Sequence, residues 1–327
     1  MSATRNGEWI LKKIECLSIC QRAKRKEIAQ VVRELSAKYP LTELLKLSGI
    51  PRSTYYYFLS HNPRDYSFDI KMIQKVFDDN KGRYGYRRMT MALNKLEEYK
   101  NNHINHKKVL KIMRLLGLKC KSKNVSKYNS YKGQVGKIVS NKLIYQVIDE
   151  ENHKTYYKRN FKCDKPNEVW CTDITEFKLG ESKLYLSPII DLYNGEIIAY
   201  DLSEHPWMSQ IWRMMNQAYE RLGMNEHPIL HSDQGWQYQQ SSFQKSLVDH
   251  GIVQSMSRKG NSIDNSVMEN FFGRMKIEMF YGYRFESLDE LKQEIHDYIY
   301  YYNNKRIKSK LKGLSPIEFR TQSYSYI

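Results

Sequence analysis

The stretch VWCTDITEF, residues 169–177, decides the fold class of the second half of the chain. Its apolar, β-branched and aromatic residues are typical of a buried strand, although the run contains one charge, Asp173. Further strands are predicted in KLYLSPIIDLYNGEIIAYDL, PILHSDQG and GIVQSMS, and the Asn194-Gly195 pair in the first of these favours a hairpin turn. The second half of the chain is therefore rich in short buried strands.

Helices are predicted between these strands. Apolar residues recur with helical periodicity over residues 208–222 and 242–249. Strands that alternate with helices indicate an α/β domain with a mixed sheet, which we place at residues 161–282. We expect a helical extension over residues 283–327.

Three acidic residues stand at notable positions in this domain. Asp173 lies inside a strand, Asp233 follows the strand of PILHSDQG, and Glu269 lies in SIDNSVMENFFGRMK, at the start of a predicted helix. Alone, Asp173 could be ion-paired and Asp233 could be a turn residue, while Ser266 and Glu269 fit a capping box. Together, a strand, a strand end and a helix can supply carboxylate oxygens to Mg²⁺, and one bridging acid suffices for two ions. We expect the three acids to be metal-ligating and catalytic.

Lys276 lies seven residues after Glu269 on the same predicted helix. An α-helix returns to nearly the same face after seven residues, so Lys276 is about 20° away from Glu269 around the axis. A cation there could hold a phosphate backbone that leads into the metal site. The alternative is an ordinary solvated lysine, and the shared face favours the DNA-binding interpretation.

Charge divides the chain into a basic front and a near-neutral back. Residues 1–160 hold 34 Lys and Arg against 14 Asp and Glu, a net charge of +20, whereas residues 161–327 hold 19 against 22, a net charge of −3. No acidic residue lies between Glu98 and Asp149. Such a segment favours a polyanionic partner through counterion release, so we expect nucleic acid binding.

The first DNA-binding unit is predicted at residues 1–60. LLKLSGIPRSTYYYFL offers a short helix, a glycine-containing turn and a second helix, the pattern of a helix-turn-helix. Arg52 and Ser53, at the start of the second helix, are the candidates for contact with a DNA groove. The alternative for Ser53 is a helix cap.

A second helical, helix-turn-helix-like unit is predicted at residues 61–118. Its last helix, in INHKKVLKIMRLLGLK, has an apolar stripe and a cationic face formed by Lys107, Lys111 and Arg114, which we expect to bind DNA. The following sequence is rich in Lys, Ser, Asn and Gly, and residues 119–160 are predicted to be a basic linker.

Composition excludes several classes of protein. With 41% hydrophobic residues the chain can build packed cores, but no signal peptide or run of about 18 apolar residues is present. We therefore expect no membrane association and a cytoplasmic, nucleoid-associated protein. The five cysteines are scattered and odd in number, which argues against a disulfide framework, and their spacing makes a poor zinc site.

Three blocks of the sequence resemble a known family. VWCTDIT, HSDQG and SMSRKGNSIDNSVMENFFGRMK are similar to the catalytic blocks of DDE transposases with an integrase core, and most similar to the orfB-type transposases of the third insertion-sequence family. The 35 residues between Asp233 and Glu269 match that family's spacing, and Lys276 matches its downstream cation. LLKLSGIPRSTYYY, RYGYRRM and YYNNKRIKSKLKGLSPIEF resemble its other blocks. One departure is Lys308, where the family commonly has His.

The resemblance implies an RNase H-like catalytic core preceded by all-α helix-turn-helix units. It implies cleavage of DNA at insertion-sequence ends and strand transfer by a 3′-hydroxyl, with two Mg²⁺ ions that Mn²⁺ could replace. Asp173 would bridge the ions, and Asp233 and Glu269 would each complete one. The implied partners are double-stranded DNA with terminal inverted repeats, target DNA, a second copy of the chain in a synaptic complex, and the upstream-frame protein of the same element.

Two alternatives stay open at this point. A nuclease on the same fold would cut DNA without joining it. A DNA-binding self-repressor would keep the three acids without using them. His231 and Asn265, near the acids in sequence, are further candidates for substrate contact.

Overall fold

The computed structural model describes residues 21–60, 65–121 and 136–324. The chain forms two compact units, residues 1–71 and 72–327. The part of the predicted linker at residues 122–135, together with Cys16 and Cys20, lies outside the described residues. No helix in the described part of the chain is both long and apolar enough to cross a bilayer.

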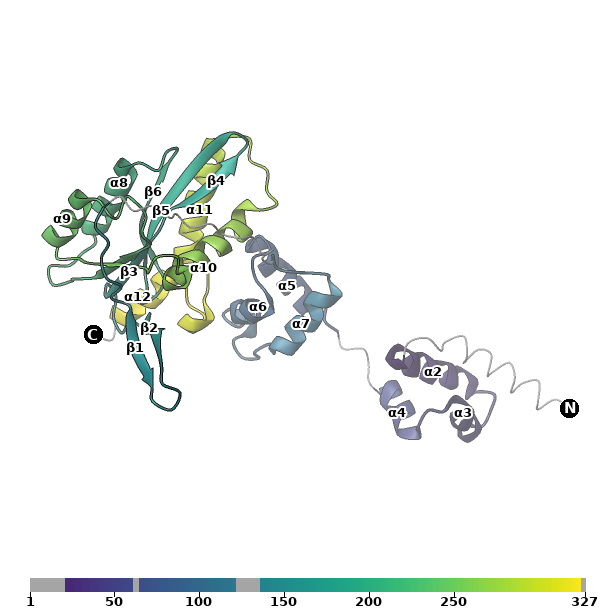
Figure 1. Ribbon diagram of the computed structural model, residues 1–327. Helices are drawn as coiled ribbons and strands as arrows, with labels where there is room; N and C mark the ends of the chain where they lie inside the picture. The colour runs from purple at the N-terminus through teal and green to yellow at the C-terminus, as the bar shows by residue number, and fades with distance from the viewer. Residues whose placement is uncertain (1–20, 61–64, 122–135, 325–327) are drawn as a thin grey trace. The chain divides into compact units, whose positions relative to one another are not determined.

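The first unit is a bundle of short helices that includes the predicted helix-turn-helix (Figure 1). The helices are α2 (Gln21–Leu35), α3 (Leu41–Ser48) and α4 (Arg52–Ser60). Gly49 ends α3 with a φ of 65°, a left-handed conformation that favours glycine, and so allows the sharp turn into α4. Ala29, Val32, Leu44 and Tyr55 form the small core. The prediction of a helix-turn-helix is confirmed.

Three more helices precede the sheet in sequence. They are α5 (Ser67–Asp79), α6 (Tyr86–Leu93) and α7 (His106–Leu115), with a 3₁₀ turn η1 (Glu97–Tyr99) after α6. Asn105 caps α7, because its side chain accepts a hydrogen bond of 2.8 Å from the Lys107 backbone N–H. Val109, Ile112 and Met113 are buried on one face of α7, as the apolar stripe predicts.

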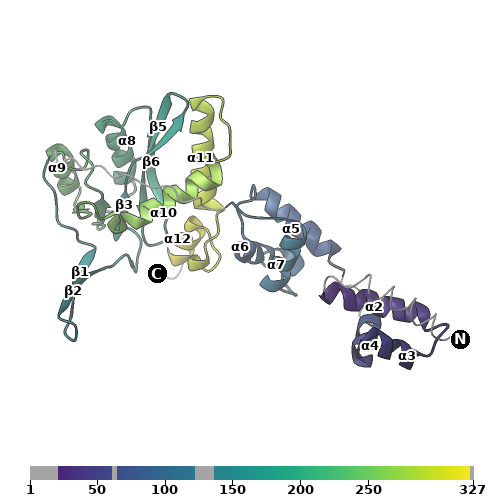
Figure 2. The same cartoon turned by 45° about the vertical axis from the view of Figure 1, so that its right-hand side comes forward.

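The predicted linker over residues 119–160 contains structure that its sequence did not lead us to expect. Residues 144–159 form an antiparallel hairpin of β1 (Ile144–Asp149) and β2 (Lys154–Arg159). Figure 2 shows this hairpin extending away from the sheet of the second unit. Its strands have large exposed residues on both faces, including Tyr145, Ile148 and Tyr157, so the alternation of apolar and polar residues that marks a half-buried strand is missing.

The second unit is built on a mixed six-stranded sheet. Its strands are β3 (Val169–Thr172), β4 (Thr175–Leu179), β5 (Ser182–Asp191), β6 (Ile197–Ser203), β7 (Ile229–Ser232) and β8 (Val253–Met256). β3 and β4 pair one after the other with β5, β6 pairs with β5 as well, and all these pairs are antiparallel. β7 is parallel to β3, and β8 is parallel to β7. The predicted α/β class is confirmed.

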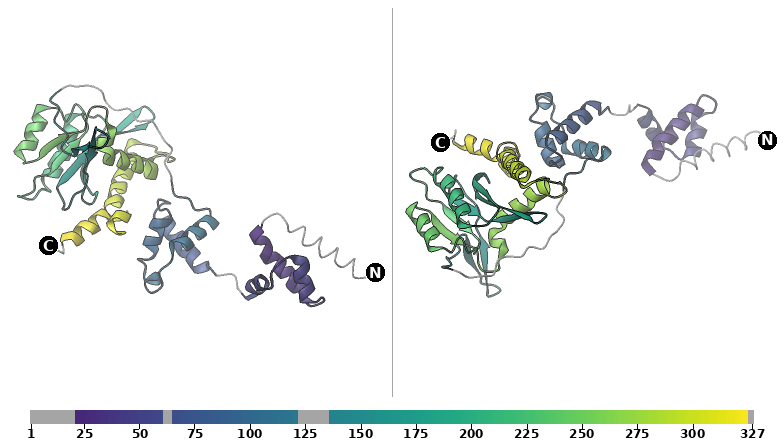
Figure 3. Two further views of the ribbon diagram at one scale, coloured as in Figure 1. Left: turned by 60° about the horizontal axis from the view of Figure 1, so that its bottom comes forward. Right: turned by 90° about the horizontal axis from the view of Figure 1, so that it is seen from above.

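Helices cover both faces of this sheet (Figure 1 and Figure 3). They are α8 (Met208–Tyr219) and α9 (Ser241–Asp249) on one face, and α10 (Ser266–Met275) and α11 (Leu288–Asn304) on the other, followed by α12 (Pro316–Tyr324). Trp170, Leu230, Met214 and Phe243 are buried between the sheet and the first pair of helices. The sheet edge where β3 and β7 end is thereby held between two helical layers.

Candidate active site

Asp173 lies where the ladder along β5 is interrupted. The predicted single strand VWCTDITEF is in fact two strands, β3 and β4, and Asp173 and Ile174 are the two residues between them. The Thr172 hydroxyl donates a hydrogen bond of 3.0 Å to the Pro188 carbonyl and holds the end of β3 against β5. The backbone leaves the hydrogen-bonded ladder with β5 at this point, and the Asp173 side chain therefore lies at the edge of the sheet.

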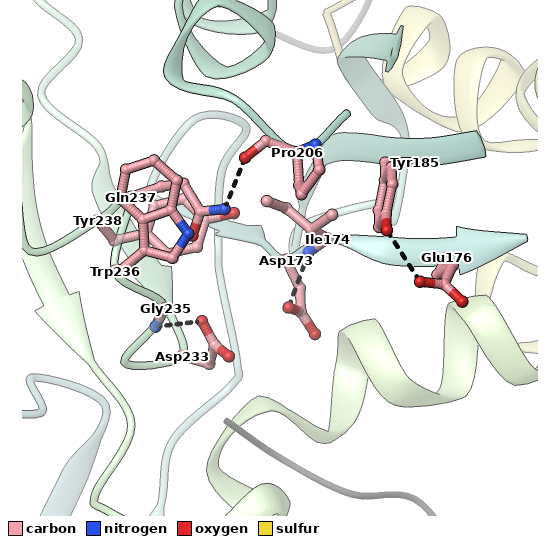
Figure 4. A pocket seen from close by; sticks show the side chains of 10 residues that line it. All are labelled: Asp173, Ile174, Glu176, Tyr185, Pro206, Asp233, Gly235, Trp236, Gln237 and Tyr238. Carbon is pink, nitrogen blue, oxygen red and sulfur yellow. Dashed lines mark hydrogen bonds between the residues drawn. The ribbon is translucent and has the colours of Figure 1, made fainter. Parts of the chain in front are cut away.

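Asp233 lies beside Asp173 because of the register of two parallel strands. Val169 pairs with Ile229 and Cys171 with His231, and the same register carried two residues further sets Asp173 opposite Asp233. Neighbouring strands are about 4.8 Å apart, so residues at matched positions are close. Figure 4 shows both carboxylates facing one pocket.

This pocket is a cavity of about 430 Å³. Its lining residues are Asp173, Ile174, Glu176, Tyr185, Pro206, Asp233, Gly235, Trp236, Gln237 and Tyr238. Backbone N–H groups orient the two aspartates: Ile174 donates to Asp173 Oδ1 and Gly235 to Asp233 Oδ1, each at 2.8 Å. The pocket therefore combines two oriented carboxylates with aromatic side chains.

The electrostatics of the pocket disfavour two free negative charges. Burial raises the pKa of Asp173 well above its usual range, and the charges of Asp233 and Glu269 raise it further. Burial also raises the pKa of Asp233. Within the described residues neither aspartate forms an ion pair, and the charge of Lys276 offsets only part of the rise in the pKa of Asp173.

Glu269 lies in the first half of α10, close enough for its charge to raise the pKa of Asp173. Asn265 Nδ2, just before the helix, donates to the Thr172 carbonyl at 3.3 Å and ties the start of α10 to the end of β3. Glu269 is not among the residues that line the cavity. Within the described residues, no group of three His, Cys, Asp or Glu side chains is gathered tightly enough to hold a metal ion.

The capping-box interpretation of Ser266 and Glu269 is wrong. The N-cap of α10 is Asn265, and no side chain makes a capping hydrogen bond there. Glu269 is the fourth residue of the helix, beyond the position from which a capping-box glutamate reaches back. Satisfying the helix start therefore does not explain its charge.

Lys276 lies at the junction of α10 and a π-helical turn, η3 (Lys276–Phe280). Its Nζ donates a hydrogen bond of 2.7 Å to the Glu176 carbonyl on β4 and lies 5.1 Å from the centre of the Phe177 ring. Burial lowers the pKa of Lys276. The side chain thus joins α10 to β4, the strand that continues from Asp173.

The remaining predicted DNA-binding residues lie on two helices outside the sheet. Arg52 and Ser53 are exposed at the start of α4. Lys107, Lys111 and Arg114 are exposed along α7, where they line a shallow cavity of about 320 Å³ with Leu110 and Leu115. The sequence prediction that these three cations share one helix face agrees with the structure.

Two other candidates do not reach the pocket. His231 is fully buried, with Nδ1 2.8 Å from Ser255 Oγ and Nε2 3.1 Å from Ser257 Oγ, and burial lowers its pKa to about 4. Asn265 is buried at the helix start. Neither residue is therefore exposed for the contact with substrate that its place in the sequence suggested.

Lys308 is half-buried, in the C-terminal part of the chain. Its Nζ donates to the Gly195 carbonyl at 3.0 Å and to the Tyr302 hydroxyl at 2.9 Å. This lysine, at the position where the resembling family commonly has His, supports the β5–β6 turn.

The apolar and aromatic wall of the pocket was not predicted from the sequence. Trp236, Tyr185 and Pro206 line the pocket with the aspartates, and they come from three separate segments. Of these three residues, only Trp236 could have been predicted from the local sequence, because it follows Asp233 by three residues in HSDQGW. The positions of Tyr185 and Pro206 depend on how β5 and the loop before α8 pack.

Comparisons with known proteins agree with this architecture. Models of the integrase core domain match residues 164–262 and 269–324, and a model of an HTH-like domain matches residues 65–125. The first match contains Asp173 and Asp233, and the second begins at Glu269.

Curated relatives cover nearly the whole chain. A putative transposase InsK for insertion sequence element IS150 from Escherichia coli is 48% identical over 90% of this chain and 98% of its own length. An uncharacterized transposase-like protein from Haemophilus influenzae is 57% identical over 67% of this chain and 94% of its own length. Among solved structures, the catalytic core domain of HTLV-2 integrase is similar at a TM-score of 0.37 and 20% identity, over 48% of this chain and 98% of that one. The chain belongs to the DDE transposases with an integrase core, in the third insertion-sequence family.

Proposed function

We propose that Asp173, Asp233 and Glu269 are the catalytic carboxylates of this transposase and that they hold its divalent metal ions. The enzyme cleaves DNA at the ends of an insertion sequence and transfers the cut strand to target DNA. The observation that carries the assignment is that none of these acids forms an ion pair within the described residues, although Asp173 is only 7% exposed, and the charge of Lys276 does not keep burial from raising the pKa of Asp173. Buried charge without a partner is costly, and a bound cation would remove the cost.

The donor set suits a hard divalent cation. Integrase-type cores use divalent metals, and carboxylate oxygens are the ligands that Mg²⁺ prefers. We propose two Mg²⁺ ions, replaceable by Mn²⁺, with Asp173 contributing to both and Asp233 and Glu269 each to one. When bound, the metal polarises the attacking oxygen and stabilises the leaving oxygen of the phosphodiester.

The protein's own contribution is orientation. Backbone N–H groups of Ile174 and Gly235 hold one oxygen of each aspartate, and the second oxygen, Oδ2, accepts no hydrogen bond within the described residues. The two Oδ2 atoms are thus the free ligands of the pocket. Asn265 holds the start of α10 at the end of β3, which keeps Glu269 beside them.

Both reaction steps are in-line displacements at phosphorus. In cleavage, water forms the new bond to phosphorus and the 3′-oxygen leaves and takes up a proton. In strand transfer, that 3′-hydroxyl oxygen bonds to a target phosphate, loses its proton, and the target's own 3′-oxygen leaves. No covalent enzyme intermediate is needed in either step.

We propose that DNA contacts come from cations outside the acid pocket. Lys276 uses one of three donors on the Glu176 carbonyl, and two donors are left for a phosphate. Arg52 and Ser53 on α4 are assigned to a groove of the end DNA. The exposed row of Lys107, Lys111 and Arg114 on α7 is assigned to the phosphate backbone.

The wider setting is part of the proposal. DNA binding follows from the helix-turn-helix and integrase domains. We propose that the DNA comprises terminal inverted repeats and a target duplex, that two or more copies of the chain meet in the synaptic complex, and that the upstream-frame protein of the same element takes part. A cytoplasmic, nucleoid-associated location fits these partners.

The test is a strand-transfer assay with labelled element-end DNA. Wild type is compared in Mg²⁺ and in EDTA with Glu269→Gln, which keeps the size of the side chain and removes the charged ligand. Glu220→Gln, an exposed glutamate at the end of α8, is the control.

Joined products are expected from wild type and Glu220→Gln in Mg²⁺ only. Equal joining by Glu269→Gln would remove Glu269 from the site. Cutting without joining by wild type would favour a nuclease, and binding without cutting would favour a self-repressor.

A further inference from the structure

A buried aspartate with two arginine partners lies just before α10 and has no role in the proposed reaction. Its centre is Asp264, in a 3₁₀ turn, η2 (Ser262–Asn265), that leads directly into α10. The Asp264 side chain has no exposed surface. Its oxygens accept hydrogen bonds from Arg159 Nε at 2.8 Å, from Arg258 Nε at 2.9 Å and Nη2 at 3.1 Å, and from Asn141 Nδ2 at 3.1 Å.

These bonds connect segments that are far apart in the sequence. Arg159 is the last residue of β2, Asn141 precedes β1, and Arg258 follows β8. Arg159 Nη2 also donates to Asn261 Oδ1 at 3.2 Å, within the same loop as Asp264. The loop from β8 to α10, residues 257–265, is therefore fastened at both of its ends and to the base of the β1–β2 hairpin.

The loop is also fastened to β7, the strand that leads directly into Asp233. Ser257, at its start, has its Oγ 3.1 Å from His231 Nε2, and His231 lies two residues before Asp233 on β7. Ser255 Oγ lies 2.8 Å from His231 Nδ1 and accepts a hydrogen bond from the Lys142 N–H at 2.8 Å. A buried polar layer thus joins β7, β8, the hairpin base and the loop.

The position of Glu269 depends on this loop. α10 begins one residue after η2, and its start has no side-chain cap. The hydrogen bond from Asn265 to Thr172, at 3.3 Å, is long for a bond that must fix a helix alone. Asp264 precedes Asn265 directly, and its bonds to Arg258 and Arg159 restrain the same backbone more firmly because they are charge-assisted.

We propose that Asp264 is a positioning residue, and that its cluster with Arg159 and Arg258 sets the place of Glu269 relative to Asp173 and Asp233. The inference rests on the proposed role of Glu269 as a metal ligand. Groups that orient metal ligands typically change metal affinity about 10- to 100-fold when they are removed. Burial acts to raise the pKa of Asp264, but the guanidinium groups of Arg258 and Arg159 hold it at about 2, so the cluster stays charged at neutral pH.

The chain offers a matched control for the expected loss of stability. Glu196 is also buried and also contacts two arginines, Arg221 Nη2 at 2.7 Å and Arg320 Nε at 3.0 Å. It precedes β6 and has no contact with the loop over residues 257–265 among the bonds described for it. Asp264→Asn and Glu196→Gln each neutralise one twice-paired buried acid.

The experiment measures two properties of the full chain without DNA. Hydrogen exchange, followed by mass spectrometry, reports on peptides within residues 257–270, and calorimetry reports the Mn²⁺ dissociation constant. We expect Asp264→Asn to speed exchange in these peptides and to raise the Mn²⁺ dissociation constant about tenfold or more. Glu196→Gln is expected to lower the melting temperature while leaving both quantities near their wild-type values. Arg159→Gln, which leaves Arg258 in place, should give smaller changes in the same direction and serves if Asp264→Asn does not fold.

Three results would overturn the proposal. One is unchanged exchange in Asp264→Asn, or in Arg159→Gln if that variant is the one that folds. Another is faster exchange with unchanged Mn²⁺ affinity, because the loop would then not act on the ligand. The third is an equal effect of Glu196→Gln on both quantities. Glu269→Gln is measured alongside: if it does not weaken Mn²⁺ binding, the ligand role of Glu269 itself fails, whereas failure of Asp264→Asn alone removes only the positioning role.

Discussion

Seven acidic residues of the second unit form two groups that differ in their partners. The first group consists of Asp191, Glu196, Asp264 and Glu278, which are at most 2% exposed and which all contact arginines. The second group consists of buried Asp173 and half-buried Asp233 and Glu269, which have no ion pair within the described residues. Asp173 and Asp233 line the pocket, and the charge of Glu269 acts on Asp173. The acids of the first group therefore form ion pairs with arginines within the fold, whereas the acids at or near the pocket form none.

The pKa values of individual acids illustrate the difference. Burial acts to raise the pKa of Asp264 and of Glu278, but their arginine partners lower both below the usual range. For Asp173, burial and the neighbouring carboxylates prevail over the charge of Lys276, and the pKa rises. Asp191 shows that an arginine does not always prevail, because burial raises its pKa despite Arg320. What separates the groups is an ion pair with an arginine, which every acid of the first group has and no acid of the second group has within the described residues.

The largest effect is expected from Asp173→Asn. The change removes a proposed ligand, and joining should fall at least about a thousandfold, which corresponds to about 4 kcal/mol of transition-state stabilisation. The metal-free variant should be no less stable than wild type, because an unpaired buried charge is lost. Product formation on labelled ends and thermal unfolding in EDTA give the two values. A variant that is both inactive and strongly destabilised would place Asp173 in the structural group instead.

Glu278→Gln should lower the stability of the protein, whereas Asp173→Asn should not. Glu278 accepts bonds from Arg306 Nη2 at 2.7 Å and Arg306 Nε at 2.9 Å, and removing one partner of a buried pair costs about 3 kcal/mol. Urea unfolding should show this loss in the free energy of unfolding. Tyr298→Phe, which removes only a 3.0 Å hydrogen bond to the same carboxylate, should cost about 1 kcal/mol and serves as the graded control. Similar unfolding curves for Glu278→Gln and wild type would contradict the comparison.

The pH dependence of stability should distinguish the two groups of acids without an activity measurement. A carboxyl group with a raised folded-state pKa binds its proton more tightly in the folded protein, so metal-free stability should fall as pH rises from about 4 through the raised values of Asp173 and Asp233. Melting temperatures in EDTA across this range should show the fall. Asp173→Asn should flatten it and added Mg²⁺ should reverse it. A wild-type curve that rises steadily over the same range would speak against uncompensated acids.

The smallest effect is expected on the surface of α7. Replacing Lys107 or Lys111 with Gln should reduce the slope of log affinity for DNA against log salt by about 0.9 for each phosphate that the protein no longer neutralises. Stability should hardly change, because both side chains are exposed. Salt titrations of end-DNA binding measure the slope, with Lys245→Gln on α9 as the control. An equal change for Lys245→Gln would mean that only the net charge matters.

Much of the fold could be predicted because its elements have local signals. The buried strands β7 and β8, the turn at Gly195 with a φ of 70°, and the cap of α7 at Asn105 all follow from short stretches of sequence. The β1–β2 hairpin could not be found in this way. Its exposed strands depend on contacts such as Arg159 with Asp264, which join residues 105 positions apart.

The candidate site was predictable in its identity but not in its surroundings. Asp173 and Asp233 stood out because a charge in or beside a buried strand needs an explanation, and the parallel register of β3 and β7 brings them together. Asp264 differs from these two residues because it has arginine partners, which come from β2 and from the loop after β8. No local sequence pattern predicts these ion pairs. Sequence periodicity gives the face on which a residue lies, whereas ion pairing depends on which distant faces meet.

The most direct test of the central claim is an anomalous diffraction experiment on crystals soaked in Mn²⁺. The claim is that the acids without arginine partners are the metal site. We expect anomalous peaks in contact with the carboxylates of Asp173 and Asp233, with Glu269 completing the site, and none at Asp264 or Glu278. Peaks at the arginine-paired acids, or an absence of metal between Asp173 and Asp233 at saturating Mn²⁺, would contradict it.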